Sequence, residues 1–266
     1  MRCVVTGGAG FIGSAVCRQL ELAGHTPVPF DRKHGDDITT TELPDASHVI
    51  HLAGVLGTDE LFDEPELAVD VNVKGTLRVL KWCVEAGAGY TGITMPPVFP
   101  SVYTATKMCA DRLAEAWRRN CGVRTSHVRA FNAFGPGQKH GAGHPRKIIP
   151  AFSTEAWNEL PLIVWGDGTQ TVDLVHTDDL ARMLVDAIRF GDGEIFDGGT
   201  GQAFTVNAVA DMVLGITGSS SKVDHMPMRR GEVPTQIVAA GAGWDLLGWR
   251  PVFRYDELVE AVESYR

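Results

Sequence analysis

The sequence lacks any apolar run that approaches the roughly 20 residues a helix needs to cross a bilayer. It also lacks a basic leader with a cleavage site, because it opens on a strand-like apolar segment. With 44% hydrophobic residues and a mean hydropathy of −0.02, its composition is typical of a soluble globular protein. We therefore expect a cytoplasmic protein without a membrane partner.

Patterns for disulfides and metal sites are missing as well. The five cysteines are scattered, odd in number and never form a CxxC pair, which indicates reduced thiols in a cytoplasmic protein. His140 and His144 share one loop, but no acidic or thiol partner accompanies them there. No bound metal is therefore expected.

An excess of positive charge is absent too. The formal net charge is −9 at pH 7, which argues against binding nucleic acid through its phosphates. This negative net charge still allows a local basic pocket for a small phosphorylated ligand. At 266 residues the chain can form one ample core, or a nucleotide-binding domain with a smaller lobe.

What the sequence does contain is most informative at its start. Residues 1–13 read MRCVVTGGAGFIG, an apolar run and a glycine-rich turn that lead into a predicted helix over 14–23. Gly7 can turn the backbone at positive φ, Gly10 has no Cβ to block phosphates, and Gly13 lets the helix approach the strand. The helix N-terminus then directs free N–H groups at an anion. The alternative is a strand–turn–helix corner that needs small residues, but the flanking elements favour a dinucleotide site. That site would comprise Gly7, Gly10, Phe11, Ile12 and Gly13.

A carboxylate follows at the end of the next predicted strand. Residues 25–30 read as a short strand that delivers Asp31, close to the roughly 20-residue offset at which an acid binds the ribose hydroxyls of NAD. A carboxylate there repels the 2′-phosphate of NADP, so NAD is the favoured cofactor. Arg32 follows at once and could soften that preference. The alternative is that Asp31 is a turn residue at a strand end.

Strand-like and helix-like segments alternate along the chain, which is typical of a parallel sheet covered by helices on both faces. Predicted strands cover 47–54 and 123–129, and predicted helices cover 69–86 and 101–119. Beyond Asn132 the sequence turns to Gly- and Pro-rich loops with shorter elements. The predicted fold class is therefore α/β, a Rossmann-type doubly wound parallel sheet with a smaller C-terminal substrate-binding lobe. We expect an NAD-binding domain over 1–131 with parts of 170–200, and the lobe over 132–169 and 201–266.

A second chemical pattern lies in mid-chain. Tyr103 and Lys107 are four residues apart near a predicted helix start, so their side chains share one face. An ammonium beside the phenol is expected to favour phenolate and to lower the Tyr103 pKa from about 10 toward the working pH, which would make the tyrosine an acid/base catalyst. Taken alone, such a pair is common on helix surfaces.

Together, the TGxxGxxG turn and the Tyr-xxx-Lys pair resemble the short-chain dehydrogenase/reductase superfamily. The chain is similar to its extended branch, the NAD-dependent nucleotide-sugar epimerases and dehydratases. Further motifs in the same order extend the resemblance nearly from end to end. They are Asp37-Ile38, His51-Leu52-Ala53-Gly54, Asn72-Val73-Lys74-Gly75-Thr76, Arg129-Ala130-Phe131-Asn132, Gly166-Asp167-Gly168-Thr169-Gln170 and Arg229-Arg230-Gly231-Glu232.

The resemblance implies roles for these residues. Tyr103 would exchange a proton with a sugar hydroxyl while hydride moves between that carbon and the nicotinamide, and Lys107 would hold the nicotinamide ribose. Asn132 and Arg229 would hold the diphosphate of the nucleotide-sugar substrate, since a guanidinium fork matches phosphate oxygens. The helices over 69–86 and 101–119 resemble the pair that forms a homodimer interface in the family. Further cofactor contacts are implied for Asp37, Ile38, Leu52, Ala53, Gly54 and Asn72.

Departures from the family pattern bear on the reaction. Where relatives carry a Ser or Thr, or the Thr-Asp-Glu of 4,6-dehydratases, this chain reads Met95-Pro96-Pro97. Methionine and proline cannot carry a proton, so dehydration by the usual acid/base pair is disfavoured. Thr94 is the nearest hydroxyl that could polarise the substrate oxygen, and the alternative is that it is an ordinary β-branched strand residue.

The chain is also shorter than the family pattern in two places. Only Ser101 and Val102 separate Pro100 from Tyr103, where relatives have a loop of some tens of residues over the sugar. This shortening predicts a more open site. After Asp31, a helix and a strand are missing from the nucleotide-binding half.

Epimerisation at C4 of a nucleotide-linked sugar is the simplest reaction that needs only NAD, Tyr103, Lys107 and one hydroxyl, for which Thr94 is the candidate. The alternatives are a reductase or a dehydratase with atypical acid/base residues, and a non-catalytic protein that binds NAD or a nucleotide sugar. The presence of both Tyr103 and Lys107 favours catalysis.

Overall fold

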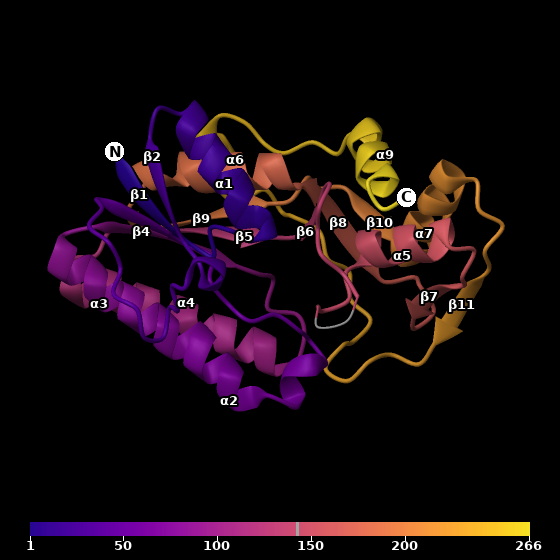
Figure 1. The fold of residues 1–266 in the computed structure, drawn as a ribbon, viewed down its shortest axis with the longest axis horizontal. Helices are drawn as coiled ribbons and strands as arrows, with labels where there is room; N and C mark the ends of the chain where they lie inside the picture. The colour runs from indigo at the N-terminus through magenta and orange to yellow at the C-terminus, as the bar shows by residue number, and fades with distance from the viewer. Residues whose placement is uncertain (142–143) are drawn as a thin grey trace.

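The computed structural model describes residues 1–141 and 144–266. In Figure 1 a sheet flanked by helices occupies one side of the molecule, and a smaller group of strands and helices occupies the other. The strands are β1 (Arg2–Thr6), β2 (Thr26–Phe30), β3 (His48–His51), β4 (Gly89–Thr94), β5 (Thr125–Ala130), β6 (Asn132–Phe134), β7 (Leu162–Trp165), β8 (Thr171–His176), β9 (Asp192–Gly198), β10 (Ala203–Thr205) and β11 (Val223–Met226). The α-helices are α1 (Phe11–Leu22), α2 (Pro65–Ala68), α3 (Thr76–Ala86), α4 (Val102–Cys121), α5 (Ile148–Trp157), α6 (Thr177–Asp186), α7 (Val206–Thr217), α8 (Trp244–Leu247) and α9 (Tyr255–Glu263). Short 3₁₀ or π segments are η1 (Arg32–His34), η2 (Glu60–Phe62), η3 (Val69–Gly75) and η4 (Ala187–Arg189).

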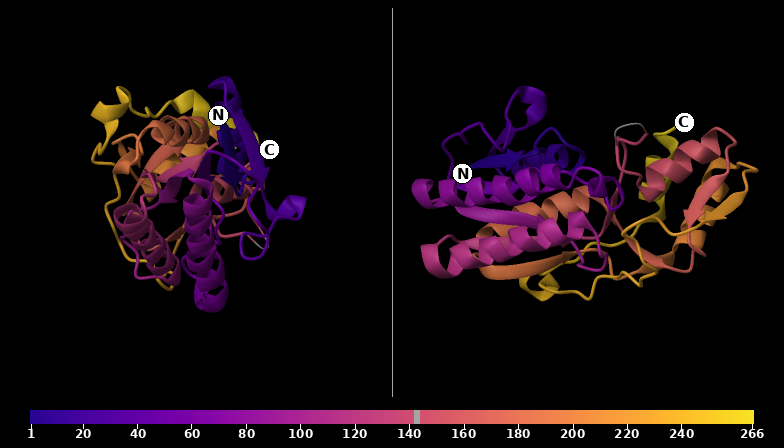
Figure 2. Two further views of the ribbon diagram at one scale, coloured as in Figure 1. Left: turned by 90° about the vertical axis from the view of Figure 1, so that its left-hand side faces the viewer. Right: turned by 90° about the horizontal axis from the view of Figure 1, so that it is seen from below.

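The larger sheet has six parallel strands in the order β2-β1-β3-β4-β5-β9. Helices α1 and α6 cover one face and α3 and α4 cover the other (Figure 2). Val5 and Ile50 are buried against the first helix pair, whereas their neighbours Val4 and Val49 are buried in the core on the opposite face. Successive strand residues point to opposite faces, so these apolar pairs require helices on both sides. The predicted doubly wound α/β fold is confirmed.

The smaller part has its own strands and core. A three-stranded sheet, β10-β8-β6, and the parallel pair β11-β7 pack with α5, α7 and α9 around buried apolar side chains that include Phe134, Phe152 and Leu174. Strand β8 belongs to this part, whereas α6 and β9 return to the larger sheet. Residues 170–200 therefore contribute elements to both the smaller part and the larger sheet. None of the helices in the described residues combines the length and the apolar character that crossing a membrane requires.

Two local departures from the predicted elements lie beside the functional region. The strand predicted over 47–54 ends at His51: the Leu52 N–H still donates to the Thr6 carbonyl at 3.1 Å, whereas the Ala53 N–H donates to the Thr6 hydroxyl at 3.1 Å. The gap predicted after Asp31 is confirmed, since the chain between β2 and β3 forms only the turn η1, which leaves β2 at the sheet edge. The helix predicted over 69–86 begins with the π-helical segment η3 instead of an α-helix.

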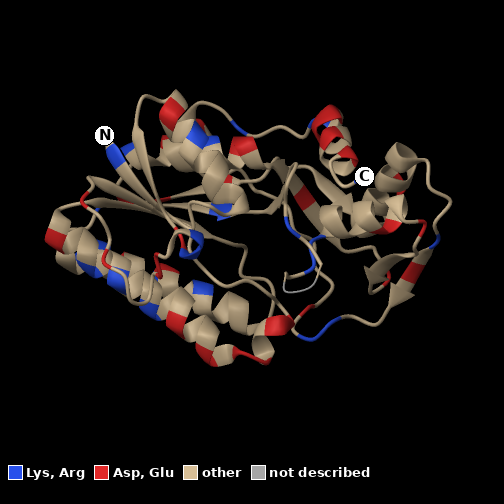
Figure 3. Ribbon diagram, in the orientation of Figure 1, with Lys and Arg blue, Asp and Glu red and all other residues tan. Residues whose placement is uncertain are grey.

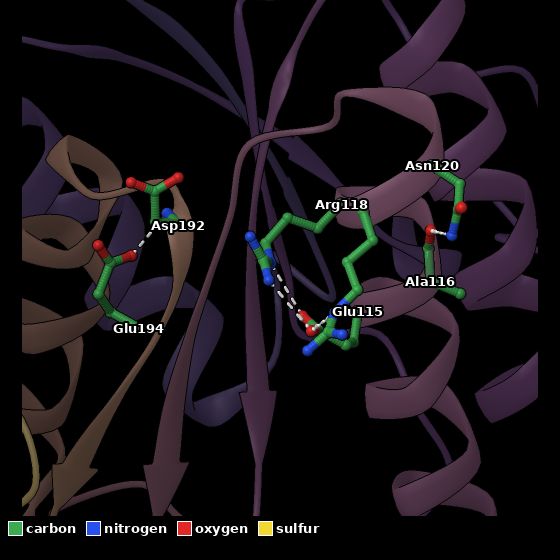
Figure 4. Close-up of polar contacts among 7 residues, drawn as sticks. Glu115, Ala116, Arg118, Asn120, Asp192 and Glu194 are labelled. Carbon is green, nitrogen blue, oxygen red and sulfur yellow. Dashed lines mark hydrogen bonds and ion pairs between the residues drawn. The ribbon is translucent and has the colours of Figure 1, made fainter.

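A cluster of ion pairs lies at the far end of α4, beside the edge strand β9. Figure 4 shows Glu115 and Arg118 paired on α4 near Asp192 and Glu194 of β9. The Arg118 Nε donates to Glu115 at 2.8 Å, and hydrogen bonds from Arg118 and Arg119 lower the pKa of Glu115 to about 2. These pairs lie within α4 itself, at the end opposite to Tyr103.

Candidate active site

A cavity of about 890 Å³ lies where the carboxyl ends of the large sheet meet the smaller part. Ligands of open α/β sheets bind in this crevice. The loops after β1, β2, β3 and β4 and the start of α4 contribute to its lining. Most of the predicted site residues are brought together here: Gly7, Gly10, Phe11, Ile12, Gly13, Asp31, Leu52, Ala53, Gly54, Thr94, Tyr103, Lys107, Asn132 and Arg229.

The glycine-rich turn between β1 and α1 forms one wall. Gly7 has a φ of +70°, and its N–H donates to the carbonyl of Phe30 on β2 at 2.8 Å. A Cβ on Gly13 would lie 2.1 Å from the Gly7 carbonyl oxygen, so α1 can approach the turn this closely only with glycine there. Gly10 caps α1 without a side chain, and no acidic residue follows in the first turn. Backbone N–H groups and a partial positive charge therefore stay available to the cavity, which fits the pyrophosphate of a dinucleotide.

Asp31 lies at the end of β2 beside this turn. One carboxylate oxygen accepts the N–H of Ala9 and the other accepts the N–H of Lys33, both at 3.0 Å. A carboxylate has about four lone-pair sites, so Asp31 keeps acceptors for ribose hydroxyls. Lys33 also lines the cavity and its ammonium donates to the Ala9 carbonyl. The sequence analysis missed Lys33, although its position just after a strand-end acid was the available signal.

Four residues predicted to contact the cofactor do not line the cavity. Arg32 pairs at the surface with Asp37 at 3.7 Å, and Ile38 is buried in the core under α3. Asn72 is buried, and its side-chain amide exchanges two hydrogen bonds with the backbone of Val55, at 2.9 and 3.1 Å. Asn72 thus fixes the loop that borders the cavity. Direct contact of Arg32, Asp37, Ile38 and Asn72 with the cofactor stays a prediction.

Tyr103, Lys107 and Asp111 follow one another at four-residue spacing on one face of α4. The helix begins directly after Ser101, whose hydroxyl accepts a first-turn N–H at 3.1 Å. Tyr103 and Lys107 line the cavity, as does Thr94 at the end of β4. The Thr94 hydroxyl donates to the Asp111 carboxylate. Because a hydroxyl has one proton, Thr94 in this arrangement can only accept from a substrate hydroxyl.

The charges on this face differ from the sequence-based expectation. Burial raises the pKa of Tyr103 to about 12, and the Asp111 carboxylate adds to the rise. Burial lowers the pKa of Lys107, and Asp111 opposes that effect. The predicted lowering of the Tyr103 pKa is therefore wrong for this structure, because desolvation and the negative charge of Asp111 both disfavour phenolate. At neutral pH the Tyr103 side chain is a protonated phenol.

The end of the cavity away from the glycine-rich turn is cationic. Arg229 pairs with Glu232 and lies over the ring of Trp165, 5.8 Å from its centroid. Lys147 lines the same region, and its pKa is lowered by burial first and further by the charge of Arg229, against opposing effects of nearby acids. The described lining carries seven Lys or Arg residues against two Asp or Glu, although the chain as a whole has a net charge of −9. This local excess suits an anionic ligand.

Unsatisfied polar atoms mark the same region. Among the described residues, Arg229 Nε, Trp165 Nε1 and Gln170 Oε1 are buried without a hydrogen-bond partner. Thr177 Oγ1, on another residue of the cavity lining, is unsatisfied as well. Buried polar groups are nearly always hydrogen-bonded in proteins, so four such atoms on residues that line one cavity fit a polar ligand. Sequence reasoning missed Lys147, Trp165 and Gln170, because their proximity to Arg229 arises from strands and helices far apart in the chain.

Residues 3–199 match a family described as the NAD dependent epimerase/dehydratase family. The chain belongs to this family. The glycan biosynthesis protein Agl12 of Haloferax volcanii is 28% identical over 310 residues, covering 100% of this chain and 98% of the relative. A UDP-glucose 4-epimerase of Mycolicibacterium smegmatis is 25% identical over 312 residues, covering 100% and 99%. The solved structure of MoeE5 with UDP-glucose and NAD has a TM-score of 0.89 and 26% identity, covering 99% of this chain and 98% of MoeE5.

Membership of the epimerase/dehydratase family confirms that the protein is an NAD-dependent enzyme. The residues present fit the cofactor, because the cradle at Gly10 and Gly13 has no room for further side-chain atoms and Asp31 retains free acceptors. Met95 and Pro96 line the cavity beside Thr94, where the family pattern has proton-carrying side chains. In this family member, neither side chain can carry a proton.

Removing the Asp111 charge tests why the Tyr103 pKa is high. In Asp111→Asn the amide oxygen can still accept the Thr94 hydroxyl, but the negative charge that disfavours phenolate is gone. We expect the Tyr103 pKa to fall, so that the rise of kcat/KM with pH moves toward lower pH by roughly one unit. Glu115→Gln, one turn further along α4, is the matched control and should leave the pH profile in place. An Asp111→Asn profile that coincides with wild type would refute this electrostatic assignment.

Proposed function

We propose that the protein is a nucleotide-sugar C4 epimerase that uses NAD for transient hydride transfer. One observation carries the proposal: Tyr103 and Lys107 line a single cavity with the glycine-rich turn in one wall and the cationic cluster around Arg229 in another. Both a dinucleotide and a nucleotide sugar bring a diphosphate, and the cavity offers a separate positive region for each. The full-length similarity to a UDP-glucose 4-epimerase supports the substrate class.

The chemistry is divided among a few side chains. NAD, when bound, supplies the hydride acceptor. Tyr103 takes the proton of the sugar hydroxyl as its carbon is oxidised and returns a proton when the carbon is reduced again. This requires phenolate, so ligand binding has to lower the Tyr103 pKa from about 12, and the Lys107 ammonium is the adjacent charge that favours this form. Arg229 and Lys147 bind diphosphate oxygens, and Asn132 positions the nucleotide sugar.

The side chains near Tyr103 favour epimerisation over dehydration. Dehydration requires a group that removes a proton from carbon and another that protonates the leaving hydroxyl. Met95 and Pro96 can do neither, and the Thr94 proton is donated to Asp111. Epimerisation needs only one group that exchanges a proton with the sugar hydroxyl. The Tyr103 phenol can be that group.

Turnover of separate nucleotide sugars tests the proposal. The protein is incubated with NAD and with individual UDP-, GDP- and dTDP-hexoses, and the products are separated by chromatography. We expect one pair of 4-epimers to interconvert without net consumption of NAD. Stoichiometric reduction of NAD would indicate a dehydrogenase instead, and ligand-induced melting shifts without turnover on any sugar would indicate a binding protein.

We also propose that two copies associate through the layer formed by α3 and α4. Exposed large apolar side chains on this layer and the preceding η3 support it, namely Val69, Val84 and Met108. Light scattering should give twice the 28.7 kDa chain mass, and a mass of one chain would reject the dimer. A cytoplasmic location is proposed on the basis of the five free cysteines.

A further inference from the structure

Arg230 joins the two parts of the molecule through a compact set of contacts. Its Nε donates to the Asp59 carboxylate at 2.8 Å, and its Nη2 donates to the Asp59 carbonyl at 3.0 Å and to the Asp63 carboxylate at 2.9 Å. The guanidinium also lies over the ring of Phe62, 4.9 Å from its centroid. We call Arg230, Asp59, Phe62 and Asp63 the clasp.

The clasp connects segments that are far apart in the sequence. Arg230 follows β11, which belongs to the smaller part, whereas Asp59 and Asp63 flank η2, which follows β3 of the larger sheet. Figure 3 shows a blue stretch of the segment after β11 beside red residues of the short turn that precedes α2. Among the described residues, none of the four clasp side chains lines the cavity.

The immediate neighbours of the clasp do line the cavity. Arg229 and Glu232 stand on either side of Arg230 and Gly231, and the Glu232 N–H donates to the Arg229 carbonyl at 3.1 Å, which closes a turn. On the other side, Thr58 precedes Asp59 and also lines the cavity. The hydrogen bonds of Arg230 to Asp59 and Asp63 therefore also hold the turn that carries Arg229 and Glu232.

Gly231 shows how closely this turn approaches the catalytic helix. Its φ is +77°, and a Cβ there would lie 2.7 Å from the Phe62 ring, 3.1 Å from the Thr58 carbonyl and 3.2 Å from the Ser101 Cβ. Ser101 caps α4 two residues before Tyr103. The turn that carries Arg229 is thus seated against both the larger part and the start of the helix that carries the reacting phenol.

We propose that Arg230 is a positioning residue, which holds the Arg229–Glu232 turn over the cavity and thereby sets the affinity for the nucleotide diphosphate. The proposal rests on the proposed function for the identity of that ligand. Exposed ion pairs are individually weak and screened by salt, but Arg230 combines three hydrogen bonds and a stacking contact in one side chain. Without them, the turn keeps its own backbone bond but loses its attachment to the larger part.

Arg230→Ala is expected to raise the dissociation constant for UDP, measured by calorimetry with NAD present, by roughly three- to tenfold. The value of kcat on any sugar that is turned over should stay within about twofold, because Tyr103 and Lys107 do not contact the clasp. The double variant Asp59→Asn with Asp63→Asn should reproduce the effect, and combining it with Arg230→Ala should add little. Arg182→Ala is the matched control, since Arg182 is also exposed, ion-paired and stacked on an aromatic ring, but lies outside the cavity lining.

Hydrogen exchange of residues 227–236 separates this proposal from the proposed function. Measured without a nucleotide sugar, exchange in this segment should be several-fold faster in Arg230→Ala than in wild type or Arg182→Ala. Unchanged exchange would overturn the clasp, and faster exchange with an unchanged UDP dissociation constant would overturn its positioning role. Failure of wild type to turn over any nucleotide sugar would reject the epimerase proposal alone, as long as UDP still binds.

Discussion

Replacing Tyr103 by phenylalanine is expected to lower kcat for nucleotide-sugar epimerisation by about 10²–10⁴-fold, the usual contribution of a positioned acid/base group. Tyr103 lines the cavity, while the neighbouring Thr94 donates its proton to Asp111, so the Thr94 hydroxyl is not placed to replace the phenol. Phenylalanine keeps the aromatic surface, and NAD binding should therefore persist. Steady-state rates at saturating NAD, together with NAD titration calorimetry, measure the two effects separately.

Tyr255→Phe provides the matched control for this substitution. Tyr255 is the first residue of α9, is 49% exposed and lies outside the cavity lining, so loss of its hydroxyl should leave kcat unchanged. If Tyr103→Phe retains the wild-type kcat, another group exchanges the proton and the assignment of Tyr103 is wrong.

Gly13→Ala is expected to abolish tight NAD binding and to destabilise the fold. The added Cβ would lie 2.1 Å from the Gly7 carbonyl oxygen and 2.8 Å from the Gly8 Cα, which are backbone atoms that can move only if the whole turn moves. Such overpacking costs roughly 1–3 kcal/mol of unfolding free energy. A displaced turn also misdirects the first N–H groups of α1, and we expect NAD affinity to fall by at least about tenfold. Thermal unfolding and NAD calorimetry report the two losses.

Gly215→Ala makes the same chemical change in another helix. Gly215 lies in α7, where a Cβ would meet nothing within 4 Å. We expect this variant to gain about 0.4–1 kcal/mol of stability, because alanine reduces the freedom of the unfolded chain, and to bind NAD as wild type does. Similar losses in both variants would show that the close packing at Gly13 is not the cause.

The features that could be predicted from the sequence depend on local spacing. The sequence places a glycine-rich turn, with Gly7, Gly10 and Gly13, between a strand and a helix. It also places Tyr103 and Lys107 on one helix face. Backbone geometry alone determines both placements. The alternation of strands and helices likewise determined the doubly wound sheet. These patterns also led to the family resemblance, which the family match confirms.

The features that could not be predicted depend on contacts between distant segments. The high pKa of Tyr103 follows from its burial and from the charge of Asp111, which are properties of the folded environment that the spacing of Tyr103 and Lys107 does not reveal. The hydrogen bonds by which the Asn72 amide holds the backbone of Val55 were likewise not predictable from local spacing. The clasp at Arg230 joins residues about 170 positions apart, a separation that no local pattern reveals.

The fate of a deuterium label at C4 of the nucleotide sugar tests the central claim most directly. The sugar to be labelled is the one that is turned over with NAD, and the product is examined by NMR and mass spectrometry. Our account predicts the 4-epimer with deuterium retained at C4, because the hydrogen leaves as hydride and returns to the same carbon while Tyr103 exchanges only the hydroxyl proton. Replacement of the label by solvent hydrogen, or its removal without formation of the epimer, would contradict the account.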